Sequence, residues 1–114
     1  MKILLDECTP RVVKRRLPGQ NIRTVQEMGW SGLKNGQLMA AADGEFDVFI
    51  TTDKNLRHQQ NLSRFRLAIM LLPSNQVPVV ESVIPDIEAA LTSIKPGDFV
   101  EITAPQVPDL KPEF

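Results

Sequence analysis

Two apolar runs in this chain end on acidic residues, and these acids have the types and spacing that could carry chemistry. Residues 2–5 are followed by Asp6 and Glu7, and residues 46–51 are followed, after one residue, by Asp53. Such runs suit buried parallel strands, whose carboxyl ends form the ligand-binding edge of an α/β sheet. If the two strands are neighbours, their carboxylates converge. Close carboxylates repel one another unless a cation lies between them, so we expect Mg²⁺ or Mn²⁺ there.

A divalent cation at such an edge predicts phosphodiester hydrolysis, because Mg²⁺ keeps most of its waters and is held by one or two carboxylates plus phosphate oxygens. Asp6 and Asp53 are the expected catalytic residues and metal ligands. Glu7 is a weaker metal candidate, since consecutive residues that leave a strand point apart. Hydroxyl groups nearby could orient a water or a carboxylate, and basic side chains could bind phosphates. These candidate substrate-binding residues are Thr51, Thr52, Lys54 and Arg57.

A structural interpretation of the same residues stays open. Asp is a common N-cap, and Asp53 precedes residues 54–62, which suit a short helix. Lys54 and Arg57 are equally typical of a solvated surface. Pairing with Asp6 favours the ligand interpretation of Asp53. Cys8, the one cysteine, is expected to be a small buried hydrophobic residue.

The elements that must position these residues alternate between strands and helices. Thr9 is the expected N-cap of the first helix and Asn35 that of the second, with Gly44 closing the second, and Pro85 kinks the last helix or starts a new one. The alternation predicts an α/β fold, a three-layer α/β/α sandwich around a mostly parallel, Rossmann-like sheet. The expected strands are 2–5, 21–25, 46–51, 67–72 and 98–103, and the expected helices are 11–17, 37–43, 54–62 and 77–94.

The composition is that of one ordinary globular domain. The chain has 114 residues, 42% of them hydrophobic and 24% charged, with a net charge of −1. A nucleic-acid partner must therefore be met by a local basic patch and not by a global field. The absence of a leader and of an apolar run of about 20 residues predicts a cytoplasmic protein without a membrane partner. We expect a domain over residues 1–103 and an extended, proline-rich tail over 104–114.

Three segments together resemble the PIN-like proteins of the DUF5615 type, small bacterial relatives of the PIN-domain ribonucleases. The segments are MKILLDEC at 1–8, GWSGLKNGQLMAAA at 29–42 and DVFITTDKNL at 47–56, and the similarity extends from Met1 to about Leu72. The resemblance implies Mg²⁺- or Mn²⁺-dependent cleavage of RNA, a homodimer, and an antitoxin-like protein partner in a toxin-antitoxin pair. It matches Asp6 to the family's first acid and Asp53 to the acid of its T-x-D motif.

The chain departs from that family pattern at two positions. An acid usually opens the helix before the central strand, where this chain has Asn35, and a second acid often follows two residues after the T-x-D motif, where it has Asn55. Each asparagine keeps an oxygen that can ligate or accept a hydrogen bond but brings no negative charge. Asn35 is therefore a candidate metal ligand and Asn55 a candidate substrate-binding residue, and we expect reduced metal affinity.

Two other functions remain open at this point. The two asparagines favour a PIN-like domain that has lost catalysis and serves as a binding or interaction module. A receiver-like phospho-acceptor domain also has acids after its first strand and an aspartate ending its third. The Lys95-Pro96 pair disfavours that function, because here it precedes a strand, the reverse of the order that a receiver needs.

Overall fold

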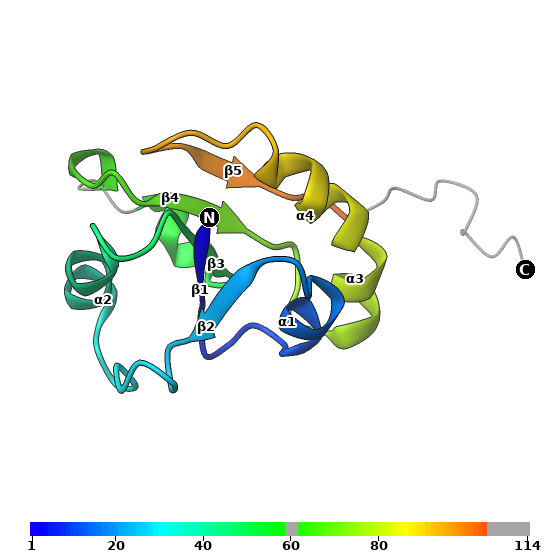
Figure 1. Ribbon diagram of the computed structural model, residues 1–114, viewed down its shortest axis with the longest axis horizontal. Helices are drawn as coiled ribbons and strands as arrows, with labels where there is room; N and C mark the ends of the chain where they lie inside the picture. The colour runs from blue at the N-terminus through cyan, green and yellow to red at the C-terminus, as the bar shows by residue number, and fades with distance from the viewer. Residues whose placement is uncertain (59–61, 105–114) are drawn as a thin grey trace, which may run out of the picture.

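The computed structural model describes residues 1–58 and 62–104 as one α/β unit (Figure 1). The expected tail lies, from residue 105, outside the described residues. The strands are β1 (Lys2–Leu5), β2 (Asn21–Thr24), β3 (Val48–Thr51), β4 (Ala68–Leu71) and β5 (Phe99–Glu101). The α-helices are α1 (Val12–Arg16), α2 (Asn35–Ala42), α3 (Val77–Ser82) and α4 (Ile84–Leu91), and the 3-10 helices are η1 (Lys54–His58) and η2 (Leu62–Arg64).

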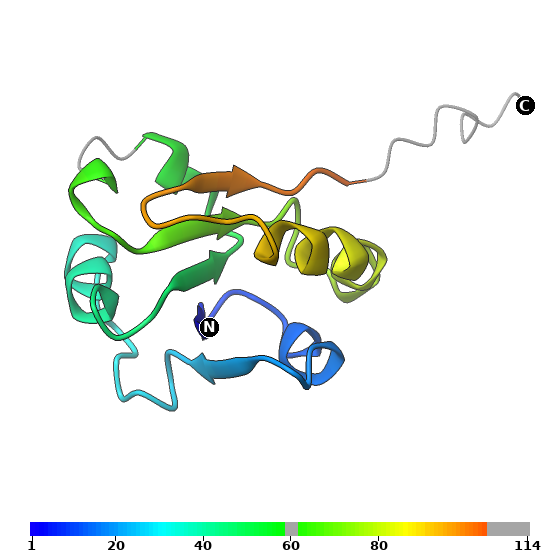
Figure 2. The same ribbon diagram turned by 45° about the horizontal axis from the view of Figure 1, so that its top comes forward.

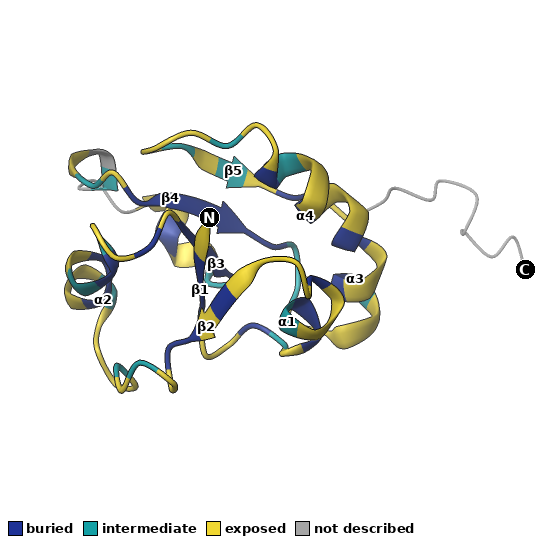
Figure 3. Ribbon diagram, viewed as in Figure 1, coloured by how far each residue is buried: buried dark blue, intermediate teal, exposed yellow. Residues whose placement is uncertain are grey.

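The strands form one sheet in the order β2-β1-β3-β4-β5, and every described pair is parallel. This confirms the predicted α/β, Rossmann-like fold with a largely parallel sheet. The central strands β1, β3 and β4 are almost wholly buried, while β5 at one edge is partly exposed (Figure 3). Continuous apolar runs are expected for strands that are covered on both faces. The strand sequences VFIT and AIML therefore match their central positions.

Helices cover both faces of the sheet, which gives three layers (Figures 1 and 2). Helices α1, α3 and α4 lie on one face, and α2 with η1 and η2 lies on the other. Side chains alternate between these layers, as they must in a strand. Ile3 and Leu5 pack under α1 and the α3–α4 pair, whereas Leu4, between them, packs under α2. The core thus has two halves that the sheet separates.

The predicted helix over residues 77–94 is two helices. Helix α3 ends at Ser82, and α4 begins at Ile84 with Pro85 in its first turn. Proline has no backbone N–H, so Pro85 cannot continue the hydrogen-bond ladder of α3. Of the two outcomes expected for this proline, the start of a second piece is the one observed.

The predicted N-caps were wrong for both leading helices. Thr9 lies in a turn, where its N–H donates to the Asp6 carbonyl at 3.0 Å, and α1 starts three residues later with Arg11 as N-cap. Lys34 is the N-cap of α2, and Asn35 is already its first helical residue. Gly44 follows the C-cap Asp43 with a φ of 90°, a conformation that glycine adopts at low cost.

The segment after Asp53 begins as a 3-10 helix rather than an α-helix. The expected helix over residues 54–62 is replaced by η1, and residues 59–61 lie outside the described residues.

In the part of the chain that the structure describes, no helix has both the length and the apolar character that a membrane-spanning helix needs.

Candidate functional site

Asp6 and Asp53 lie at the same edge of the sheet because their strands are neighbours. Strand β1 pairs with β3 in parallel, with Leu5 opposite Ile50, and the Asp6 N–H extends this ladder by donating to the Ile50 carbonyl at 3.0 Å. Asp53 follows β3 by two residues. Both acids are half-buried. The structure therefore meets the condition on which the predicted convergence depended.

Thr51 connects the two acids through its hydroxyl group. It is the last residue of β3 and is fully buried. Its Oγ1 donates to Asp6 Oδ2 at 2.7 Å and accepts from the Asp53 N–H at 3.0 Å. A buried hydroxyl with both its donor and an acceptor site used has one preferred orientation. Thr51 thus fixes the Asp6 carboxylate relative to the backbone of Asp53, a positioning role that fits the sequence-based expectation for this residue.

The Asp6 carboxylate is held by three donors but keeps room for a further ligand. Its Oδ1 accepts from the Glu7 N–H at 2.8 Å, and its Oδ2 accepts from Thr51 and, at 3.4 Å, from Cys8 Sγ. A carboxylate offers about four lone-pair directions. One therefore remains on Asp6. Glu7 itself is exposed, with its side chain on the surface, as its place next to Asp6 in an extended segment predicts.

Asp53 caps η1 and also contacts Asn35. Its Oδ1 accepts from the Asn55 N–H at 3.0 Å, which is the capping bond that the structural interpretation predicted. Its Oδ2 accepts from Asn35 Nδ2 at 3.1 Å, across from the first turn of α2. Two of about four lone-pair directions stay free. The cap and ligand interpretations of Asp53 are therefore compatible with one another.

Asn35 contacts Asp53 through its side-chain amide, and this contact places it at the candidate site. An aspartate at position 35 would place its carboxylate next to that of Asp53, and the hydrogen bond that the Asn35 amide donates would be lost. We expect Asn35→Asp to lower the Tm without metal and to raise Mn²⁺ affinity about tenfold, roughly 1.4 kcal/mol, since ligand charge strengthens binding of a hard cation. The measurement is the Tm with and without Mn²⁺, because ligand binding to the native state raises stability.

The matched control for that substitution is Asn21→Asp, on the exposed amino end of β2. It adds the same charge far from Asp53 and is expected to leave the Mn²⁺-dependent Tm shift as in the wild type. If Mn²⁺ shifted the Tm of Asn35→Asp no more than that of Asn21→Asp, Asn35 would not face the cation.

The remaining predicted substrate-binding residues divide into two groups. Lys54 and Asn55 are exposed beside Asp53, at the start of η1, and are free to meet a ligand that lies at this edge. Arg57 is instead paired with Glu101 of β5, with Nε 2.5 Å from Oε1. This ion pair engages the guanidinium, and within the described residues Arg57 has no hydrogen bond or ion pair with Asp6 or Asp53. The cause is the neighbouring edge strand, which the local sequence does not reveal.

Cys8 is exposed, so the prediction of a buried cysteine was wrong. It lies in the turn after Asp6, at the carboxyl edge rather than under the sheet. Its Sγ lies 3.0 Å from Thr52 Oγ1, and Thr52 is thereby directed toward the β1 turn instead of toward Asp53. Thr52 is half-buried and makes a second contact, at 3.5 Å, with the Cys8 carbonyl. The Cys8–Thr52 contact joins the two strand ends on one side of Asp6.

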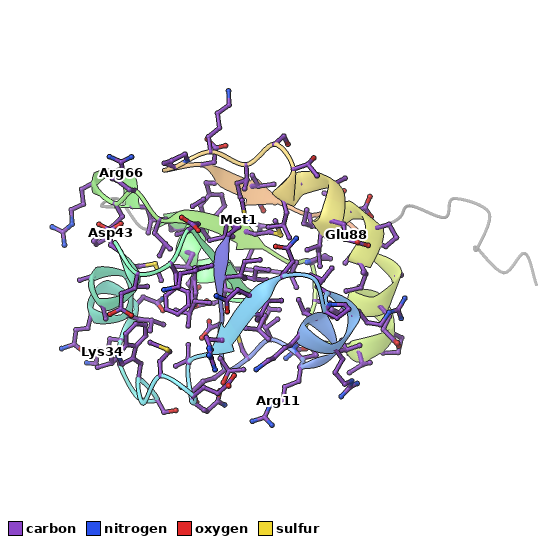
Figure 4. All side chains as sticks on the ribbon, viewed as in Figure 1. Met1, Arg11, Lys34, Asp43, Arg66 and Glu88 are labelled. Carbon is purple, nitrogen blue, oxygen red and sulfur yellow. The ribbon has the colours of Figure 1, made fainter. Side chains whose placement is uncertain are left out.

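A basic cluster beside the acids was missed from the sequence. Arg11, Lys14 and Arg15 line a hollow of about 500 Å³ with Thr24 and Glu27, at the carboxyl end of β2. Figure 4 shows the Arg11 side chain at the outer surface next to α1, pointing away from the sheet. The available signal was spacing, because residues at i, i+3 and i+4 share one face of a helix. We call this feature the basic hollow.

Among the residues that the structure describes, Glu27 is the one acid in the wall of the basic hollow. Lys14 Nζ lies 2.7 Å from its Oε1, which also accepts from the Thr24 N–H at 3.0 Å, and Arg23 lies 3.7 Å from its Oε2. The hydrogen bond from Lys14, and then that from the Thr24 backbone, lower the pKa of Glu27 from 4.5 to about 2. The carboxylate is therefore charged at any ordinary pH.

The lowered pKa of Glu27 predicts a specific acid sensitivity. A group whose pKa is lower in the folded state contributes stability above its ordinary pKa and loses it as pH falls through the folded value. We expect the contribution of Glu27 to be complete above about pH 4.5 and to disappear between about pH 4.5 and 2. Urea midpoints across this window measure it. Glu27→Gln should give a shallower pH dependence than the wild type, and identical curves would contradict the assignment.

Acids at the opposite, amino edge of the sheet have structural partners. Asp43 Oδ1 accepts from the N–H groups of Arg66 and Leu67 at 2.9 and 3.0 Å, which fixes the chain as it enters β4 (Figure 4). Asp47 Oδ2 accepts from the Lys2 N–H at 2.7 Å. A hollow of about 470 Å³ lies between these residues and Lys95. It is at the far end of the strands from Asp6 and so is not part of the candidate site.

The donor set at the carboxyl edge fits a water-rich divalent cation. Asp6 and Asp53 are half-buried carboxylates with free lone pairs, and Asn35 contacts Asp53. Mg²⁺ is typically held by one or two carboxylates and keeps several waters. Structural zinc needs four protein ligands. Within residues 1–58 and 62–104 there is no group of three or more His, Cys, Asp or Glu side chains placed to share an ion. Mg²⁺ or Mn²⁺ therefore fits these residues better than zinc does.

Comparison with known proteins gives no relative. A scan against protein-family models, a search of curated proteins and a search of solved structures each found no match.

Proposed function

We propose that the protein is a Mg²⁺- or Mn²⁺-dependent phosphodiesterase that cleaves RNA at the carboxyl edge of its sheet. The observation that carries the proposal is the chain of contacts Asp6–Thr51–Asp53–Asn35, which joins three separate elements around two half-buried carboxylates. RNA as the substrate, a homodimer and an antitoxin-like protein partner come from the resemblance to PIN-like proteins. A cytoplasmic location belongs to the same proposal.

In this function the two aspartates hold the cation and Thr51 keeps Asp6 in place. A bound Mg²⁺ or Mn²⁺ ion would lower the pKa of a water ligand and polarise a phosphoryl oxygen. Asp6 has one free lone-pair direction and Asp53 has two, which suits direct or water-bridged ligation. Lys54 is exposed next to Asp53, and in this proposal it contacts a substrate phosphate.

The test is cleavage of a labelled single-stranded RNA by purified protein with Mn²⁺ and with EDTA. The wild type should cleave only with Mn²⁺, and Asp6→Asn, purified in the same way, should be inactive. The isosteric change keeps an oxygen that can accept from the Thr51 hydroxyl or the Glu7 N–H but removes the charge that binds a cation. Activity that persists in EDTA would contradict the proposal, because the cleavage would not need the metal. Activity that persists in Asp6→Asn would also contradict it, because the cleavage would then come from a contaminating nuclease.

A catalytically degenerate binding module is the second candidate, and one observation favours it. The Asn35 amide donates to Asp53 Oδ2, and so supplies a neutral donor where related sites supply a further acid. If the protein is such a module, it should bind RNA or a protein but not cleave RNA at any Mn²⁺ concentration. Metal-dependent cleavage that Asp6→Asn abolishes would rule it out.

The receiver-like alternative needs a lysine close to Asp53, and Lys95 is not there. Lys95 lines the hollow at the amino edge of the sheet, together with Asp43 and Lys2. Asp53 lies at the carboxyl edge. A lysine at the opposite end of the strands cannot contact a phosphorylated Asp53.

A further inference from the structure

The basic hollow, lined by Arg11, Lys14, Arg15, Thr24 and Glu27, opens at the same sheet edge as the two aspartates. Thr24 is the register partner of Leu5, the residue before Asp6, and the Val25 N–H donates to the Leu5 carbonyl at 3.0 Å. Neighbouring strands are about 4.8 Å apart. The wall of the basic hollow is therefore about one strand spacing from the chain that carries Asp6.

In the described part of the chain, the two arginines of the basic hollow have no ion-pair partner, unlike other basic residues of the same region. Within residues 1–58 and 62–104, no carboxylate lies within ion-pair distance of Arg11 or Arg15. Their neighbour Arg16 contacts Glu81 of α3 at 3.4 Å. Both arginines are exposed on the outward side of α1, whose Val12 and Val13 face the core. Two guanidinium groups on one rigid helical turn suit bidentate contacts with phosphate oxygens.

The wall opposite α1 is fixed before any ligand arrives. Thr24 Oγ1 accepts from the Glu27 N–H at 3.1 Å, and the Glu27 carboxylate accepts from the Thr24 N–H. These two reciprocal hydrogen bonds fix the loop that follows β2. Lys14 and Arg23 share the single carboxylate of Glu27. The four cations in and beside the basic hollow thus face one acid in its wall. A chain with a net charge of −1 concentrates a positive field here.

We propose that the basic hollow binds the backbone of a single-stranded nucleic acid, with phosphates on Arg11 and Arg15, and directs the next phosphodiester to Asp6 and Asp53. A positively charged groove that tracks the backbone is the usual device for binding single strands. The order β2-β1-β3 places the basic hollow on one side of Asp6 and Lys54 on the other. A nucleic-acid strand lying across this sheet edge would then contact the arginines of the basic hollow first, the two aspartates next, and Lys54 last. The proposal deepens the proposed function and rests on it for the position of the acids.

Binding without cleavage tests the basic hollow separately from catalysis. Fluorescence anisotropy of a labelled single-stranded RNA is titrated in EDTA between about 50 and 200 mM salt, with single-stranded DNA of the same sequence as a second probe. The test variant is Arg11→Gln/Arg15→Gln. The control is Arg16→Gln/Arg66→Gln, which removes the same charge from the α3 side of α1 and from the amino edge.

We expect the test variant to bind at least about tenfold more weakly at about 50 mM salt. The slope of log K against log salt should fall by about 1.4, since each phosphate contact on a single strand contributes about 0.7. The control should keep the wild-type slope. Equal losses in both variants, no loss in the test variant, or no binding by the wild type would each overturn the proposal. Similar affinity for RNA and DNA supports it, because backbone phosphates are common to both.

The RNA-binding test of the basic hollow and the cleavage test of the proposed function can fail separately. If Asp6→Asn abolishes Mn²⁺-dependent cleavage while Arg11→Gln/Arg15→Gln binds RNA normally, only the basic hollow is refuted. If no cleavage occurs but the test variant loses RNA binding, the basic hollow stands as a nucleic-acid surface of a non-catalytic module. Circular dichroism of both double variants verifies that the fold is intact.

Discussion

Thr51→Val is expected to lower the free energy of unfolding by about 1–3 kcal/mol and to weaken Mn²⁺ binding, although valine has nearly the same shape. Thr51 is fully buried, and its hydroxyl group satisfies both Asp6 Oδ2 and the Asp53 N–H. Valine leaves the Asp53 N–H without its partner and frees the Asp6 carboxylate to rotate. Urea unfolding monitored by circular dichroism measures the first effect, since a lower midpoint at constant slope reports a change in stability.

Thr51→Ser is the control for that substitution, because it keeps the hydroxyl and removes only a methyl group. Serine should retain the Mn²⁺ affinity of the wild type even if the lost methyl group costs some stability. Comparable loss of Mn²⁺ affinity in Thr51→Val and Thr51→Ser would show that Thr51 acts through packing alone. Unchanged stability and affinity in Thr51→Val would show that the two hydrogen bonds do not connect the acids.

Asp53→Asn is expected to reduce Mn²⁺-dependent RNA cleavage by about 100-fold or more while it changes stability little. The substitution removes a charge from the proposed metal site, and transition-state stabilisation by a metal is worth several kcal/mol, with about 1.4 kcal/mol for each factor of ten. Asparagine still has an oxygen for the Asn55 N–H, so the cap of η1 persists. Asn35 can present its own amide oxygen to the new side chain. Initial rates at saturating Mn²⁺, together with the Tm, measure both quantities.

Asp47→Asn is the matched control for Asp53→Asn. Asp47 lies at the amino edge, where its carboxylate accepts from the Lys2 N–H. The same loss of one charge there should leave cleavage within about twofold of the wild type, because exposed charges farther apart than a Debye length of about 10 Å are largely screened. If Asp53→Asn kept full activity, Asp53 would be a helix cap and nothing more.

The sheet edge that carries the acids could be predicted, because it follows from apolar runs and their ends, whereas the strand order came only from the structure. The run that became β3 is buried on both faces, and such runs are diagnostic of central parallel strands. Asp6 directly follows β1 and Asp53 follows β3 by two residues, so both acids had to lie at one edge once the strands were neighbours. The break at Pro85 could be predicted for a similar reason, since proline acts on its own backbone.

Contacts between side chains from distant segments could not be predicted from local patterns. Arg57 has the right charge and lies near Asp53 in the chain, yet Glu101, 44 residues away, takes its guanidinium. Cys8 follows an apolar strand but lies in the turn at the edge, where it contacts Thr52. Asn35 is a residue type that often caps helices, yet the N-cap of α2 is Lys34, and the Asn35 amide contacts Asp53 instead. Each difference comes from tertiary packing, which overrides local propensity.

The measurement that tests the central claim most directly is a Mn²⁺ titration of the wild type, Asp6→Asn and Asp53→Asn, followed by electron paramagnetic resonance of the free ion. The wild type should bind Mn²⁺ at one site per chain, and either substitution should weaken that binding by about tenfold or more, because each removes a negative charge from a two-carboxylate site. Equal Mn²⁺ binding by the wild type and both variants, or no binding by the wild type, would contradict a metal site between Asp6 and Asp53.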